Sequence, residues 1–181
     1  MDNTNDLLNM LSGMFGPSHF RNWNQYICNN RFCEGGMVVG VRFGYRRLTP
    51  KEAASGQFGP VGLRIAKVDA STPILLQIRD WIVRDQPSLQ TVAEWLNAQG
   101  VLPGPSVKGG RWNEQVLLDL LRDPILWGLR RFRQVQRRFD TARGQEFRIL
   151  NPEPLQKHEP TLAHMTHGAW LELQKALDAM G

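Results

Sequence analysis

Arginine and lysine residues gather in two stretches of this chain, and their side chains could bind phosphate. Residues 101–150 contain ten lysines and arginines against five acidic residues, a net charge of +5. Residues 41–70 contain six lysines and arginines against two acidic residues, a net charge of +4. Arginine dominates both stretches, and its planar guanidinium suits two-pronged contact with phosphates or guanine edges. The pattern predicts a polyanionic partner, with a solvated basic face as the alternative.

Within these stretches we predict a set of side chains that contact nucleic acid. Lys108 and Arg111 stand just before a predicted helix, whose N-terminus attracts phosphate. The polar residues that begin this helix are candidates for base edges, although a helix cap is the alternative role for Asn113. The later arginines would supply backbone charge, while Arg46 and Arg47 would enter a neighbouring groove. The complete set is Tyr45, Arg46, Arg47, Arg64, Lys67, Lys108, Arg111, Asn113, Glu114, Gln115, Arg130, Arg131, Arg133, Arg137 and Arg138.

The sequence offers little for catalysis or for a cofactor. It contains no Ser/His/Asp set, no paired-carboxylate motif, no metal-ligand spacing and no nucleotide-binding fingerprint. Ser88 and Ser106 are interpreted as cap and turn residues, and Cys28 and Cys33 are too few for a disulfide framework or a zinc site. We therefore expect no enzymatic activity, no cofactor and no metal. Three histidines are interpreted as lone surface residues: His158, His164 and His167.

Length and composition limit the class of protein. At 181 residues, 41% of them hydrophobic, the chain can bury one good core. No run approaches the ~20 apolar residues of a membrane helix, and the polar start, Met1–Asp6, is unlike a secretory signal. These features predict a cytoplasmic protein with no membrane contact and no small-molecule substrate.

Helices must position most of the candidate contacts. Apolar residues at helical spacing predict one helix over residues 72–85 and a second that follows an N-cap at Ser88 and ends before Gly100. Glycines and prolines then break the chain, and Asn113 caps a third helix that ends before Asp123. We expect these three helices to form the core.

Strands and loops account for much of the remaining chain. Alternating residues over 129–138 and a returning run at 147–150 predict a β-hairpin that projects arginines as a wing does. Residues 61–68 predict a short strand, residues 49–60 a polar loop, and residues 166–180 a last amphipathic helix. The predicted fold class is therefore mainly α with a small β-hairpin, a helix-turn-helix-like DNA-binding domain.

The segment Pro87–Pro103, PSLQTVAEWLNAQGVLP, resembles the "recombinase" DNA-binding domain of the large serine recombinases, the phage integrases and mobile-element resolvases. The family's glycine-rich linker is similar to the run from Gly35 to Arg46, and its closing helix is similar to residues 166–177. The resemblance covers roughly residues 35–180. The family's next helix motif matches Trp112, Val116, Leu120, Leu121, Asp123, Pro124, Trp127 and Gly128.

The resemblance implies three regions. Residues 1–34, with helices predicted over 4–12 and 18–32, would be a remnant of the helix that leads to a missing catalytic domain. Residues 35–70 would be a Gly-rich basic linker with an extended segment, and residues 71–181 the recombinase-type DNA-binding domain. A double-stranded DNA partner, a homodimer or tetramer in an intact recombinase, and a bacterial or phage origin with nucleoid association are implied as well.

The expected function is a DNA-binding fragment of a serine site-specific recombinase that recognises an attachment or resolution site. It would be catalytically inert alone, because the family places its nucleophilic serine in another domain. The alternatives are a nonspecific DNA- or RNA-binding helix-turn-helix protein, and a protein-interaction domain that exposes Trp23, Tyr26 and Trp170. If the chain binds DNA, loss of Arg111 reduces the difference in affinity between duplex sequences, whereas loss of Arg133 lowers the affinity for all duplexes alike.

Overall fold

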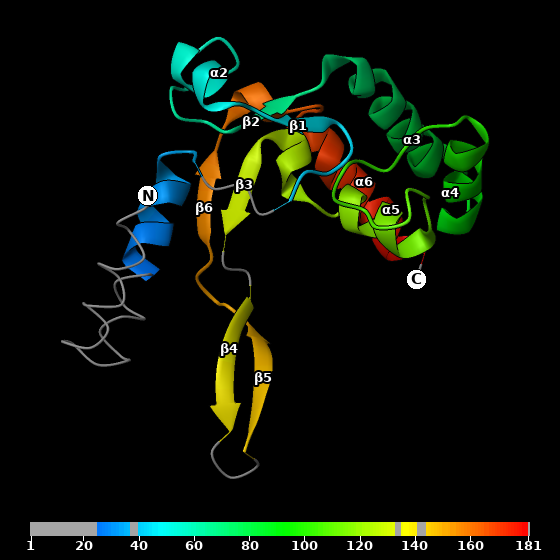
Figure 1. The fold of residues 1–181 in the computed structure, drawn as a ribbon. Coiled ribbons are helices and arrows are strands. Elements are labelled where there is room, and N and C mark those ends of the chain that lie inside the picture. The colour runs from blue at the N-terminus through cyan, green and yellow to red at the C-terminus, as the bar shows by residue number, and fades with distance from the viewer. Residues whose placement is uncertain (1–24, 37–39, 133–134, 141–143, 181) are drawn as a thin grey trace, which may run out of the picture.

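The computed structural model describes residues 25–36, 40–132, 135–140 and 144–180 (Figure 1). This part of the chain is mainly α-helical with small antiparallel sheets, as the sequence predicted. The predicted helix over residues 4–12, the first part of the helix predicted from residue 18, and Trp23 lie outside the described residues.

Four helices enclose the main hydrophobic core: α3 (Thr72–Asp85), α4 (Leu89–Ala98), α5 (Glu114–Leu121) and α6 (His167–Ala179). Each helix buries one apolar stripe, and Ile78, Leu96, Leu117 and Leu173 are fully enclosed. The prediction of a three-helix core was therefore incomplete. The stripe of α6 was visible in the sequence, but no sequence pattern identified α3 as its packing partner.

Side-chain caps fix the starts of α4 and α5. The Ser88 hydroxyl accepts a hydrogen bond from the amide of Thr91 at 3.1 Å, and the side-chain oxygen of Asn113 accepts one from the amide of Val116 at 2.9 Å. Both predicted caps are confirmed. The connection between the helices runs from residue 99 to residue 113, much longer than the turn of about three to four residues in a helix-turn-helix motif. That motif is therefore not confirmed.

The long connection is fastened to the core by Trp112. Its amide donates to the side-chain oxygen of Asn97, and its carbonyl accepts from the Asn97 amide group, both at 2.9 Å. The indole is buried and donates to the carbonyl of Val101 at 2.8 Å. Trp112 thereby ties the end of the connection to α4 and to its beginning at Val101.

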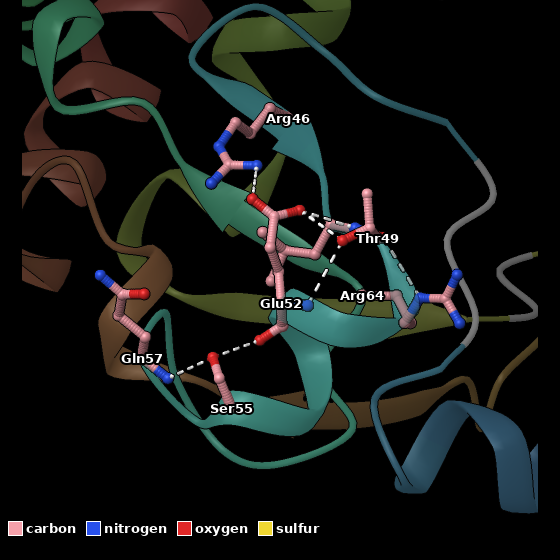
Figure 2. Close-up of polar contacts among 7 residues, drawn as sticks. Arg46, Thr49, Glu52, Ser55, Gln57 and Arg64 are labelled. Atoms are coloured by element: carbon pink, nitrogen blue, oxygen red, sulfur yellow. Dashed lines mark hydrogen bonds and ion pairs between the residues drawn. The ribbon is translucent and has the colours of Figure 1, made fainter.

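A short helix, α2 (Pro50–Ser55), occupies the segment that was predicted to be a polar loop. That prediction was wrong because it overlooked a capping box. The hydroxyl of Thr49 accepts from the amide of Glu52, and the Glu52 carboxylate accepts from the amide of Thr49 at 2.8 Å (Figure 2). Strands β1 (Tyr45–Arg47) and β2 (Ile65–Lys67) form an antiparallel pair beside it.

The remaining strands form a β-ribbon in two parts, whose outer part confirms the predicted hairpin, whereas the pairing of residues 129–132 with residues 155–158 was not predicted. At its base, β3 (Leu129–Phe132) pairs with β6 (Leu155–His158). Its outer part consists of β4 (Val135–Asp140) and β5 (Gln145–Leu150), and extends away from the helices (Figure 1). Phe132 pairs with Leu155 whereas Val135 pairs with Leu150, so the register shifts between the parts, next to prolines that cannot donate to a ladder.

Gly128 fixes the point at which β3 begins. Its φ of +91° lies in the left-handed region, and an added Cβ would lie 2.7 Å from the carbonyl oxygen of Glu159. The same two residues are joined by a hydrogen bond from the amide of Glu159 to the carbonyl of Gly128 at 2.7 Å. Backbone geometry therefore sets how β3 and β6 align. The other short elements are the 3-10 turns η1 (Asp69–Ser71), η2 (Pro124–Trp127) and η3 (Pro160–Leu162).

Residues 25–33 form a helix that lies against the base of the ribbon. Phe32, at its C-terminal end, is buried. Within the described ranges, no helix has the length and apolar character needed to cross a membrane.

Candidate nucleic-acid interface

An open groove of about 760 Å³ lies between α5, the loop at residues 106–108 and the base of the ribbon. Three exposed cationic side chains line it, those of Arg42, Lys108 and Arg131. Asp119 and Asp123 contribute acidic groups to the same groove. The groove therefore carries an excess of positive charge and can accept a polyanion or several separate phosphates.

Of the twelve predicted contact residues whose side chains the structure describes, seven are exposed. Lys108 from the loop and Arg131 from β3 meet at the groove although they are distant in sequence. Arg111 is exposed shortly before α5 begins. The predicted residues with exposed side chains are Arg47, Lys108, Arg111, Asn113, Glu114, Gln115 and Arg131.

The exposed surface of α5 is polar and partly acidic. Gln115 donates from its amide group to the Asp119 carboxylate at 2.8 Å, one helical turn away, and Glu114 stands beside it. Because carboxylates repel phosphate, this surface is suited to base edges and not to the DNA backbone. Phosphate contacts would have to come from cations beside the helix, such as Lys108. Asn113 has the cap role that was its alternative.

Tyr45 does not lie on the surface. Its ring is 4% exposed, and its hydroxyl donates to the carbonyls of Ile125 at 2.8 Å and Leu162 at 3.1 Å. Burial raises the pKa of this hydroxyl, and the nearby Asp123 charge adds to the shift. The prediction that Tyr45 contacts nucleic acid is corrected here, because the buried ring joins β1 to the core.

Arg130 is also buried, at 5% exposed. Its guanidinium lies over the ring of Phe32, and burial lowers its pKa while the charge of Glu159 raises it. Arg130 forms part of the groove wall but presents almost no surface, so its predicted role as a backbone contact is corrected.

The cations of residues 41–70 are largely engaged within the protein. Arg46 forms an ion pair with Glu52 at 2.9 Å (Figure 2) and lies over the ring of Phe58. Arg64 donates from Nε to the carbonyl of Leu48, and Lys67 lies 3.1 Å from Asp69. The charge count of this stretch therefore overstated the positive charge that it offers to a partner.

The predicted arginines of the outer ribbon are only partly described. Arg133 lies outside the described residues. The backbones of Arg137 and Arg138 lie in β4, opposite Arg148 and Phe147. Arg148, which was not among the predicted contacts, is exposed on β5.

Arg42, Asp119 and Asp123 were missed as residues of the groove. Arg42 lies in the same basic stretch as Arg46, and no local pattern distinguishes a residue that faces the groove from one that does not. Asp123 was recognised only as the end of α5, whereas its carboxylate lies 2.6 Å from the guanidinium of Arg42. These contacts depend on residues far apart in the sequence.

The three histidines do not share one environment. His158 and His167 are exposed, as predicted, and their rings lie beside Trp127. His164 is buried, so its interpretation as a surface residue was wrong. Its Nε2 donates to the carbonyl of Gly44 at 2.9 Å, and its Nδ1 therefore accepts from the hydroxyl of Thr72. Among the described residues, no three potential metal ligands come together.

Residues 70–180 match a family model described as Recombinase. The match covers all four core helices and the β-ribbon, including α5 and Arg131 at the groove. No curated protein and no solved structure matches the chain.

Proposed function

The chain belongs to the Recombinase family, and on this premise we propose that it binds double-stranded DNA at the site of a site-specific recombination reaction. The finer proposal is that it belongs to the serine type and recognises an attachment or resolution site. We also propose that it binds DNA without cutting it, and that an intact recombinase would use it as part of a dimer or tetramer. The motifs of residues 87–103 and 112–128 support the serine type.

The observation that carries this proposal is the meeting of Lys108 and Arg131 at one groove beside α5. Lys108 comes from the loop before the helix and Arg131 from the ribbon, and both line the groove to which α5 contributes Val116 and Asp119. A duplex presents phosphates on either side of its base edges. Cations from two segments that line one groove together with a polar helix suit such a partner.

The proposed contacts fall into two classes. Lys108, Arg131 and Arg148 would bind phosphates and contribute similarly to every sequence. Arg111 and Gln115 would bind base edges, an arginine preferring guanine and a glutamine preferring adenine. Tyr45 and Arg130 are left out of this narrower set because both are buried.

A binding measurement with selected duplexes tests the proposal. Sites would be selected from a random duplex library, and affinity measured by fluorescence anisotropy between 50 and 200 mM salt. The three proposed phosphate contacts, at a slope of about 0.9 each, would lower the affinity by about 40-fold over this range. A shuffled duplex and an RNA stem of the same length serve as competitors. A flat salt dependence would contradict DNA binding, and equal affinity for all competitors would favour the nonspecific alternative.

Catalytic inertness needs a separate measurement. The protein would be incubated with its selected duplex and separated on a denaturing gel. We expect intact strands and no covalent protein–DNA adduct. Such an adduct would show that the chain carries a nucleophile of its own.

A further inference from the structure

Arg130 lies at the base of the ribbon, in contact with the helix of residues 25–33. Its guanidinium carbon is 4.8 Å from the centre of the Phe32 ring. Phe132, two residues further along β3, stacks on the same ring with 5.3 Å between the ring centres and 18° between the planes. Two side chains of one strand thus hold one aromatic side chain of the helix.

Lys157 of β6 provides a second link between the same elements. Its ammonium group donates to the carbonyl of Cys33, in the last turn of the helix, at 2.7 Å. A cation is favoured there because the carbonyl groups at a helix end carry partial negative charge. Lys157 is also the strand partner of Arg130. The helix is therefore fastened to both strands of the ribbon base.

Glu159 balances the charge of this junction. It is 3% exposed, and its carboxylate lies 2.9 Å from the Lys157 ammonium group. Its charge also favours the charged form of Arg130 against the effect of burial. A buried guanidinium needs an opposing charge, so Arg130 and Glu159 have to be buried together.

We infer that Arg130 is a positioning residue that fastens the helix of residues 25–33 to β3 and β6 through Phe32. By holding the ribbon base, it fixes the direction in which β4 and β5 leave the helical body. Arg131, its neighbour on the opposite face of β3, is the exposed side chain at the groove. Adjacent arginines would thus have different functions, one structural and one in contact with the ligand. The effect on DNA binding rests on the proposed function, whereas the junction itself does not.

Hydrogen exchange without DNA tests the junction directly. In Arg130→Met we expect exchange to accelerate by about tenfold or more in residues 25–33 and in the backbone amides of β3 and β6, with α4 and α5 unchanged. Arg131→Ala is the matched control and should leave all these rates as in the wild type. Unchanged exchange in Arg130→Met would overturn the inference.

A second pair of variants covers the case in which Arg130→Met does not fold. Arg130→Met with Glu159→Gln removes both buried charges of the junction together, and Phe32→Leu removes the ring while the buried site stays apolar. Both should show the same local acceleration. Combining Phe32→Leu with the Arg130/Glu159 change should add little, because the contact is already lost. Fully additive effects would show that Phe32 and Arg130 act separately.

The salt dependence of duplex binding then distinguishes positioning from contact. Arg131→Ala should reduce the slope of log affinity against log salt by about 0.9, the value for one lost phosphate contact. Arg130→Met should weaken binding together with its altered exchange, and Arg130→Lys should restore only part of it because an ammonium group cannot stack on Phe32 as a guanidinium does. A slope reduced by about 0.9 in Arg130→Met, with normal exchange, would make Arg130 a phosphate contact. If the wild type binds no duplex, the proposed function fails, and the exchange experiment still decides on the junction.

Discussion

The guanidinium Nε of Arg42 lies 2.6 Å from the carboxylate of Asp123. This ion pair in the lining of the groove joins two segments that are far apart in the sequence. Asp123 also accepts a hydrogen bond from the amide of Ile125 at 3.1 Å and so begins η2. One carboxylate thus has a structural role as a cap and an electrostatic role in the groove. Any phosphate that enters would compete with Asp123 for Arg42.

Asp123→Asn should strengthen duplex binding. Asparagine keeps the oxygen that caps η2 but removes the charge that neutralises Arg42. The pair is partly exposed, so the gain is expected to be about two- to fivefold. Anisotropy with a selected and a shuffled duplex would measure it, and both affinities should rise alike. Weaker binding by a variant of unchanged stability would contradict this role of Asp123.

Arg111→Ala and Arg131→Ala should affect binding in different ways. Loss of Arg111 removes a base contact, so we expect the binding free energy for the selected duplex to become less favourable by about 1–3 kcal/mol. The difference in affinity between the selected and the shuffled duplex should therefore become smaller. Loss of Arg131 removes a phosphate contact, and its effect should be similar on both duplexes. Competition titrations with the two duplexes measure the gap. Equal effects of the two substitutions would invalidate this division of roles.

Folding stability should decrease as the pH falls from about 6.5 to 4, because of His164. Burial disfavours its imidazolium form and lowers its pKa to about 4, although the hydrogen bond to Gly44 opposes the shift. In this range the unfolded chain binds a proton that the folded chain does not, so the lost stability is of the order of 2–3 kcal/mol. Urea unfolding at a series of pH values measures it.

His164→Gln is the control for this pH effect. The glutamine amide can still donate towards Gly44 but does not titrate. The variant should lose part of the pH dependence between 4 and 6.5, whatever its stability at neutral pH. An identical slope in wild type and variant would assign the effect to other groups.

Gly104→Ala should destabilise the protein more than Gly109→Ala. Both glycines have left-handed backbones, with φ of +91° and +90°, so both substitutions carry a strain of about 1–2 kcal/mol. An added Cβ at Gly104 would lie 2.6 Å from the backbone nitrogen of Phe43, whereas nothing lies within 4 Å at Gly109. The clash should add about 1–3 kcal/mol and displace the loop that carries Lys108. Thermal unfolding compares the two, and equal losses would argue against the close approach.

Local signals in the sequence were sufficient for the helices but not for all of the groove. The apolar spacing of residues 72–85 and the caps at Ser88 and Asn113 act within a few residues, so they could be identified from the sequence. The capping box at Thr49 was equally local and was overlooked. The burial of Arg130 depends on Phe32, nearly a hundred positions earlier, and no local pattern indicates which of two adjacent arginines faces that ring. The charge count of residues 41–70 overestimated the positive charge available to a partner for a similar reason, because Arg46 and Lys67 form ion pairs with Glu52 and Asp69 in the folded chain.

Arg130 and Arg131 are adjacent and identical, so a shift of β3 by one residue would again place an arginine at the position of Arg130. If the strand moved by one place, Arg131 would take the position of Arg130 under the Phe32 ring, but Arg133 would replace Phe132 in the stack on that ring. The close approach of Gly128 to Glu159 also opposes the shifted strand, because a side chain at that position would displace the backbone. A glycine outside the groove thus helps to determine which arginine faces a ligand, and we expect its replacement to weaken the preference for one strand register over the other.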